Sequence, residues 1–267
     1  MLKNNKPLIS VVTVCFNSEK SIIETIESVI NQTYDNIEYI LVDGSSTDAT
    51  VKMIESYKNK ALEKGVKLIL VSEPDNGVYD AMNKALKLAI GKWGIFMNSG
   101  DCFYDKNVIE EIFVNPFSKE DFKFIIGDTL RKYADSSFLS SPTFFCDPIK
   151  GMGFSHQSVF FDVFLHKNKP FSYEYKLMAD FDFFCKCVKE NTKYLQVPIV
   201  ISIFETGGIS RIKWKLNIIE RYRIFKKYKN NRKTKDYLLF INIVLRFLIV
   251  TFLGEGRFKK ILKIFKK

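Results

Sequence analysis

Residues 8–16 read LISVVTVCF, an unbroken run of apolar and β-branched residues. Such a run predicts a strand buried on both faces, which is the environment of a central strand in a parallel sheet. In the segment that follows, apolar residues recur at helical spacing: Ile22, Ile23, Ile26, Val29 and Ile30. The stretch therefore predicts a strand followed by a helix.

The same alternation continues to about residue 100. Further strands are expected at residues 37–43 (IEYILVD), 66–73 (VKLILVSE) and 93–97 (WGIFM), with helices at about 47–64 and 78–90 between them. Strands and helices at this spacing predict right-handed crossovers and a mainly parallel sheet covered by helices on both faces. The predicted fold class is therefore α/β and Rossmann-like.

Beyond residue 105 the periodicity is weaker. Residues 122–130 and 195–205 are expected to form strands, and residues 175–190 have helical character. The last part of the chain, from about residue 213, is expected to be helical and basic.

Carboxylates follow three of the four predicted strands. Asp43 ends the second strand, Glu73 and Asp75 follow the third, and Asp101 follows the fourth. Ligands of such sheets bind beyond the carboxyl ends of the strands, and gathered carboxylates repel one another unless a cation or hydrogen-bond donor lies among them. No glycine-rich fingerprint or Walker lysine follows the first strand, where the chain reads CFNSEKS. The pattern suits a nucleotide whose diphosphate is held through a divalent metal.

Asp101, in FMNSGD (96–101), is the best candidate metal ligand, and Asn98 and Ser99 could add oxygens or bind a sugar. Asp43 could accept hydrogen bonds from a base or a ribose. Both aspartates have structural alternatives: Asp101 as an ordinary turn residue, and Asp43 as the start of an Asx turn and helix cap. The residues alone leave these alternatives open. The polar residues at the start of the helix at 78–90 could likewise serve only as a helix cap.

Three linked motifs resemble family 2 glycosyltransferases of the GT-A fold. They are SVVTVCFNSE (10–19), IEYILVDGSSTDAT (37–50) and EPDNGVYDAMNKALKLAIGKWGIFMNSGD (73–101), in the order and spacing of that family over residues 8–105. The likeness is closest to bacterial enzymes that build surface polysaccharides, and it reduces the turn-only interpretation of Asp101 to the minor alternative.

The resemblance implies roles for individual residues. Asp101 would be the last carboxylate of a DxD-type motif that binds Mn²⁺ or Mg²⁺. Ser99 stands where many relatives have a second acid, so one carboxylate remains for the metal, and Met82 stands where many have arginine. Residues implied to contact the nucleotide-sugar are Phe16, Asn17, Glu19, Asp43, Asp80, Asn83, Lys84, Asn98 and Ser99.

The second half carries the implied catalytic carboxylate. LMADFDFF (177–184) matches the family's acidic motif, with Asp180 as the general base and Asp182 as the second candidate. If one of the two faces solvent, we expect it to be Asp182. His156 would touch the acceptor or the diphosphate, or else be a structural, hydrogen-bonded histidine. Arg211, at the end of the glycine-containing loop FETGGISR (204–211), could reach the diphosphate as that loop closes.

Positive charge is concentrated at the C-terminal end of the chain. Residues 211–267 contain 18 lysines and arginines against three acidic residues, whereas the whole chain has a net charge of +11, so the remainder is acidic. Residues 237–253 are almost entirely apolar but include Arg246, and they are short of the roughly 20 residues that cross a bilayer. We predict a helix lying in the interface of an anionic membrane. The alternative is a helix packed on the catalytic domain with solvated lysines.

The sequence therefore predicts a GT-A catalytic domain at 1–210, with a nucleotide-binding half (1–105) and an acceptor half (106–210), and a basic, membrane-associating tail at 211–267. The predicted activity is an inverting, metal-dependent, hexosyltransferase-type reaction from a nucleotide-sugar, UDP-linked, to a lipid-linked saccharide. Five cysteines without metal-finger spacing and a start without a signal-peptide apolar region suit a cytosolic body, peripheral at the membrane.

Two other classes of protein are alternatives. A sugar-phosphate nucleotidyltransferase would need a glycine-rich, basic loop after the first strand, which CFNSEKS lacks. A non-catalytic membrane-docking protein would need neither Asp101 nor Asp180. Nucleic acid is not an expected partner, because no base-reading module is recognisable.

Overall fold

Four parallel strands form the first half of the central sheet, in the order β3-β2-β1-β4. In this computed structural model the described residues are 6–114, 122–133, 136–143, 145–205, 213–229 and 233–253. The four strands are β1 (Ile9–Cys15), β2 (Ile37–Asp43), β3 (Lys67–Ser72) and β4 (Trp93–Phe96). All four agree with the sequence prediction to within about a residue, because β1 and β2 are buried along their whole length and their apolar runs are continuous.

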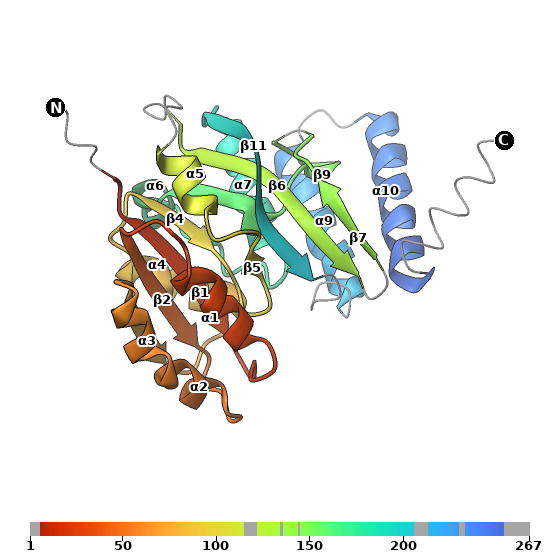
Figure 1. Cartoon of the computed structure of the whole chain (residues 1–267). Helices are drawn as coiled ribbons and strands as arrows, with labels where there is room; N and C mark the ends of the chain where they lie inside the picture. Colours follow the sequence, from red (N-terminus) through yellow and green to blue (C-terminus); the bar gives the residue numbers. More distant parts are fainter. Residues whose placement is uncertain are drawn as a thin grey trace.

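The helices of this half connect the parallel strands, and Figure 1 shows them around β1 and β2. They are α1 (Ile22–Ile30), α2 (Thr50–Ser56), α3 (Lys58–Glu63) and α4 (Val78–Leu88). The single helix expected at 47–64 was wrong, since it is broken at Tyr57. That residue donates its N–H to Ile54 three residues back, and its hydroxyl is bound to Glu27 of α1 at 2.9 Å. The side-chain anchor and the tightened turn together explain the break.

The sheet continues beyond β4 with strands of both directions, in the order β10-β6-β11-β5, and β7 pairs with β6. β10 is antiparallel to β4 and to β6, while β6 and β11 are parallel. The bounds are β5 (Cys102–Phe103), β6 (Phe124–Tyr133), β7 (Ser136–Ser140), β10 (Val159–Asp162) and β11 (Tyr194–Glu205). A separate two-stranded hairpin is formed by β8 (Cys146–Asp147) and β9 (Gly151–Met152). The strands expected at 122–130 and 195–205 are confirmed as β6 and β11.

Two apolar layers enclose the sheet. On one side, Val12 and Val14 of β1 pack with residues of α4 and α7, and on the other, Ile9 and Val11 pack with α1 and α5. This alternation follows the two-residue period of a strand. The remaining helices are α5 (Val108–Val114), the 3₁₀ turn η1 (His156–Ser158), α6 (Val163–Asn168), α7 (Ala179–Lys189), α9 (Trp214–Tyr228) and α10 (Thr234–Leu253).

The two C-terminal helices form a small core of their own. Phe225 of α9 stacks on Phe240 of α10 with ring centroids 5.1 Å apart, and Ile149 completes the cluster. Figure 1 shows α9 and α10 at the end of the molecule opposite to β2 and α3. The helical part of the predicted tail therefore packs on the acceptor half as well as carrying its basic residues.

One buried carboxylate holds the sheet to the end of α4. Glu38 of β2 accepts hydrogen bonds from the Ser10 hydroxyl (2.5 Å) and from the N–H groups of Ile90 (2.6 Å) and Gly91 (3.0 Å). These bonds fix where the chain leaves α4 and enters β4, and so where the segment after β4 is delivered. A side chain at Gly91 would meet the Leu8 carbonyl oxygen at 2.8 Å, so the crossing is also sterically tight.

We expect Glu38→Leu to lower the free energy of unfolding by about 2–4 kcal/mol, because the Ser10 hydroxyl and the Ile90 N–H lose their acceptor and the Gly91 N–H keeps only its bond to Ser10. The measurement is urea denaturation followed by circular dichroism. Glu63→Leu, at the exposed end of α3, is the matched control and should stay within about 0.5 kcal/mol of the parent. Equal effects of the two substitutions would contradict the role given to Glu38.

Candidate active site at the carboxyl end of the sheet

Asp43 lies where the parallel strands end. The register aligns Cys15 of β1 with Asp43 of β2, and Asp43 with Ser72 of β3. The Asp43 carboxylate is buried and accepts hydrogen bonds from the Ser46 N–H (2.9 Å), the Ser46 hydroxyl and the Ser72 hydroxyl (2.7 Å). The turn-forming role considered for Asp43 is thus present, and its predicted contact with a base or ribose stays a prediction.

The loops after β1 and β2 are bound to each other. Asn17 has a positive φ of 48°, which asparagine tolerates better than most residues, and its side-chain oxygen accepts from the Thr47 N–H at 2.9 Å. Glu19 exchanges hydrogen bonds with the same loop, accepting from the Ala49 N–H and donating its own N–H to Asp48, both at 3.1 Å. Asn17 and Glu19, both predicted to contact the nucleotide-sugar, therefore hold the two loops together.

Phe16 presents an aromatic surface at this edge. Its side chain is 61% exposed, although it follows a fully buried strand. A Cβ atom added to Gly44 would lie 3.4 Å from the Phe16 ring and 2.5 Å from Asp75 Oδ2. An exposed ring and a carboxylate thus lie close to the same glycine, an arrangement that offers stacking and hydrogen-bond acceptance to a planar ligand.

Residues of α4 form the next part of the site. Asp80 accepts from the Asn76 N–H at 2.9 Å, and this bond, against the effect of burial, lowers the pKa of Asp80. Lys84 lies between Glu73 (2.9 Å) and Asp80 (3.7 Å). Asn83 points elsewhere: its amide donates to the Phe171 carbonyl and accepts from the Phe171 N–H, both at 2.9 Å. The buried Asn83 side chain thus holds the chain before α7, which the sequence did not indicate.

Asp101 is a buried carboxylate whose neighbours include His156 and Gln157. It is 6% exposed, and burial raises its pKa to about 7, although the charge of His156 and a hydrogen bond from Gln157 act in the opposite direction. Nearby, the side-chain oxygen of Asn98 is buried and has no hydrogen-bond partner among the described residues. Ser99 shares a 3.0 Å hydrogen bond with Ser21.

Asp180, in the first turn of α7, joins the two halves of the protein. It accepts from the Tyr79 hydroxyl of α4 at 2.7 Å and from the Phe181 N–H at 2.8 Å, and its other oxygen lies 3.3 Å from His156 Nδ1. Burial disfavours the carboxylate, but the bonds from His156 and Tyr79 outweigh it and lower the pKa of Asp180. His156 Nε2 in turn lies 3.4 Å from the Asn98 amide nitrogen.

The protonation of His156 follows from the same contacts. Burial acts to lower the pKa of His156, but the hydrogen bond and charge of Asp180 outweigh burial and raise it above 6.5. The structural alternative for His156, a hydrogen-bonded histidine, is therefore present, and its contact with an acceptor or diphosphate stays a prediction. Tyr79 and Gln157 complete the cluster, and they were not among the predicted site residues, although Tyr79 is part of the motif VYDAMN.

Asp182 does not face solvent, so that expectation was wrong. It is 5% exposed and forms an ion pair with Lys227 of α9 at 2.8 Å. The reason is that α9 covers this side of α7, a long-range contact without a local signal. Arg211 and the glycines of its loop lie outside the described residues.

The described residues contain no group of three or more histidines, cysteines, aspartates or glutamates that could hold a metal ion. Asp101 offers one carboxylate, and the unpartnered Asn98 oxygen is a second hard donor. This set fits a divalent cation that receives its remaining ligands from a bound substrate.

The chain matches the model of glycosyl transferase family 2 over residues 10–184. It therefore belongs to this family, and it is a glycosyltransferase with a GT-A fold. The mannosyltransferase PcManGT from Pyrobaculum calidifontis, solved with GDP-Man and Mn²⁺, has a TM-score of 0.65 at 16% identity, over 92% of this chain and 71% of that one. At that identity the likeness establishes the fold alone.

Two relatives are similar in sequence. The PGL/p-HBAD biosynthesis glycosyltransferase of Mycobacterium bovis is 29% identical over 209 residues, which are 76% of this chain and 79% of the relative. The UDP-Glc:alpha-D-GlcNAc-diphosphoundecaprenol beta-1,3-glucosyltransferase WfaP of Escherichia coli is 29% identical over 135 residues, 51% of this chain and 52% of WfaP.

We expect Asp101→Asn to stabilise the protein at pH 8 in the absence of metal and substrate. The native pKa of about 7 lies above the ordinary 3.8, so the native state holds the proton more tightly than the unfolded chain. The stability that this group contributes is therefore lost as pH rises from about 4 to about 7. The gain from Asp101→Asn should be on the order of 1–3 kcal/mol at pH 8 and smaller at pH 5, measured by urea denaturation.

Asp35→Asn is the control, because Lys6 donates a hydrogen bond to the exposed Asp35 carboxylate and lowers its pKa. Its substitution should bring no gain at pH 8. A stabilisation by Asp101→Asn that did not change between pH 5 and pH 8 would contradict the raised pKa of Asp101.

Proposed function

We propose that this protein transfers a sugar, with inversion, from a UDP-linked donor to a lipid-linked saccharide during the synthesis of a cell-surface polysaccharide. The observation that carries the proposal is the cluster of Asp101, Asn98, His156, Asp180 and Tyr79, drawn from both halves of the chain to the carboxyl end of the sheet. The names of the mycobacterial and E. coli relatives support the class of product and a lipid-linked acceptor.

Asp180 is the proposed general base. Its lowered pKa keeps it ionised at neutral pH, so it can accept a hydrogen bond from the acceptor hydroxyl. The acceptor oxygen then bonds to the anomeric carbon while its proton passes to Asp180 Oδ2 or Oδ1. The bond from the anomeric carbon to the diphosphate oxygen breaks, and its electron pair leaves with the nucleoside diphosphate. Tyr79 and His156 hold the carboxylate in place and stabilise its charged form.

Asp101 and Asn98 would hold Mn²⁺ or Mg²⁺ together with the donor diphosphate. The ion supplies positive charge to the leaving group. The protein's part is to present one buried carboxylate whose charge lacks full compensation, so that binding of a cation lowers the pKa of Asp101 from about 7. The solved neighbour that contains Mn²⁺ supports a divalent ion of this kind.

The base and ribose of the donor are assigned to the edge formed by Phe16, Asn17, Glu19 and Asp43. The exposed Phe16 ring can stack on a base. Asp80 lies in the first turn of α4 and Lys84 one turn further along it, and we assign both to the sugar of the donor. The name of the E. coli relative supports UDP, and the solved neighbour contains GDP-Man.

We also assign the protein to the inner surface of the cell membrane. Over the described ranges, no helix is both long and apolar enough for a membrane span. α10 instead leaves a stripe of exposed apolar residues at helical spacing, formed by Leu238, Ile241, Leu245 and Ile249. Its opposite side, with Phe240, packs on α9. The stripe adjoins the basic residues of 211–267, and the combination is typical of helices that lie in an anionic interface.

We expect Asp180→Asn to reduce the rate of sugar transfer by about 10²- to 10⁴-fold, the usual contribution of a general base, while donor binding is retained. Asp101→Asn should reduce the rate and weaken donor binding in the presence of Mn²⁺, and EDTA should have a matching effect on the parent. The assay is release of nucleoside diphosphate from UDP- and GDP-sugars, alongside thermal shift for donor binding.

Asp35→Asn is again the control and should retain the parent rate. Urea denaturation of each variant shows whether it is folded under assay conditions. The proposed function would be refuted if folded Asp101→Asn and Asp180→Asn both transferred sugar at the parent rate.

We expect the triple substitution Leu238→Gln, Ile241→Gln and Leu245→Gln to release the protein from anionic vesicles. The three side chains are between 52% and 63% exposed, so the fold should tolerate glutamine. The control replaces three exposed apolar residues elsewhere: Leu62→Gln, Ile90→Gln and Leu139→Gln. In co-sedimentation with vesicles containing phosphatidylglycerol, equal binding of both triple variants would contradict the assignment of the α10 stripe.

A further inference from the structure

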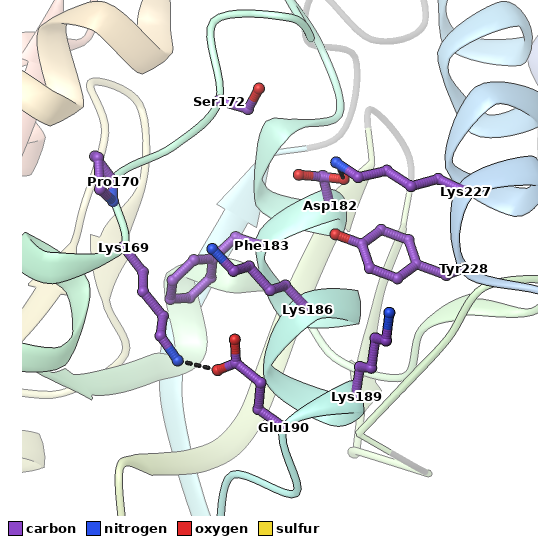
Figure 2. Close-up of a pocket in the computed structure, with 10 residues that line it drawn as sticks. All are labelled: Lys169, Pro170, Ser172, Asp182, Phe183, Lys186, Lys189, Glu190, Lys227 and Tyr228. Atoms are coloured by element: carbon purple, nitrogen blue, oxygen red, sulfur yellow. Dashed lines mark hydrogen bonds and ion pairs between the residues drawn. The ribbon is translucent and has the colours of Figure 1, made fainter.

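A cavity of about 590 Å³ opens on the far side of α7 from Tyr79 and His156, between α7, the chain that precedes it and the end of α9. Figure 2 shows the side chains that line it. Charged groups dominate: four lysines, Lys169, Lys186, Lys189 and Lys227, and two carboxylates, Asp182 and Glu190. The lysines come from three different elements of the fold, so their convergence is a tertiary feature.

Both carboxylates are already neutralised by lysines of the cavity. Lys227 lies 2.8 Å from Asp182, and Lys169 forms an ion pair with Glu190. Asp182 is buried, so it holds the Lys227 ammonium at the wall; the neighbouring Tyr228 hydroxyl is also hydrogen-bonded to Asp182. The carboxylates thus position donors and leave the cavity with excess positive charge.

That excess resides on Lys186 and Lys189. Among the described residues neither takes part in an ion pair. Both lie in the last turn of α7, where the helix dipole favours positive charge. The dipole does not account for Lys169 and Lys227, which approach from other elements, nor for the enclosed volume. In Figure 2, Lys186 points between Lys169 and Asp182, toward the middle of the cavity.

We propose that this cavity binds the phosphate or diphosphate group of the lipid-linked acceptor. Lysine ammonium groups bind phosphate oxygens as strong charge-assisted donors, Ser172 adds a hydroxyl, and Phe183 and Pro170 supply apolar walls. The volume falls within the roughly 300–1,000 Å³ of small-molecule sites.

The position of the cavity supports this ligand. Asp182 follows Asp180 by two residues in the first turn of α7, so the cavity and the proposed base are on opposite sides of one helical turn. Lys227 and Tyr228 are at the end of α9, close in sequence to α10 and its apolar stripe. An acceptor anchored in the membrane could thus place its charged linkage here. This inference rests on the proposed function for the identity of the acceptor.

The test is binding of inorganic pyrophosphate to the full chain, by calorimetry at low salt with EDTA, so that the proposed metal site does not contribute. Lys186→Gln with Lys189→Gln should weaken binding at least about tenfold, equivalent to about 1.4 kcal/mol. The control, Lys52→Gln with Lys64→Gln, removes the same charge from exposed positions on α2 and after α3 and should change binding by no more than about twofold. Equal weakening by both pairs, or none by the first, would overturn the proposal.

A second measurement separates the acceptor's diphosphate from an ordinary headgroup. Vesicles of phosphatidylcholine are prepared with either an isoprenyl diphosphate or phosphatidylglycerol. The Lys186→Gln, Lys189→Gln protein should lose affinity for the first and keep it for the second; equal loss on both would refute the acceptor assignment. Donor hydrolysis should remain at the parent rate in this variant, which distinguishes failure of the cavity from failure of the proposed function.

Discussion

The hydrogen bonds to the Asp180 carboxylate are the interaction on which the site depends, because they join its two halves. A buried carboxylate is costly unless it is paired and hydrogen-bonded. Here the partners are Tyr79 of α4 and His156, immediately before β10. α4 rests on β1 and β2, while β10 pairs with β4. The sheet therefore determines where the two donors meet, and α7 must begin there for its charge to be stabilised.

Three buried aspartates differ in how the free-energy cost of burying a carboxylate is offset. Asp43 is surrounded by neutral donors from serine side chains and backbone, and it stabilises the turn. Asp180 is matched by a histidine whose own pKa it raises. Asp101 has neither solution in full, and burial leaves its pKa near 7. A carboxylate whose charged form is destabilised in the free protein is typical of a functional site, since the missing compensation can come from a ligand.

The strands of the first half could be predicted because their signals are local. The continuous apolar runs of β1 and β2 place these strands, and the register brings Asp43, at the carboxyl end of the sheet, into line with Cys15 and Ser72. What could not be predicted depends on contacts distant in sequence. Asp182 is buried by α9, and Asn83 binds the backbone at Phe171, 88 residues away. The spacing of apolar residues within α7 and α4 does not indicate that α9 or the backbone of Phe171 contacts these helices.

α7 carries acidic residues in its first turn and lysines in its last turn. Carboxylates at the sheet edge repel phosphate, and in the proposed function Asp101 would bind a cation, so a ligand that carries phosphate needs positive charge nearby. Charges more than about 8–10 Å away are largely screened at physiological salt, so the positive charge has to lie close to the phosphate. Lys227, Lys186 and Lys189 meet this condition under the proposal, because they line a cavity beside α7, the helix that carries Asp180. Under the proposed function, α7 would thus present the negative Asp180 to the reacting groups and positive groups on its other side. The two ends of the proposed acceptor differ in the same sense: a hydroxyl that must lose a proton, and a phosphate linkage that must be neutralised.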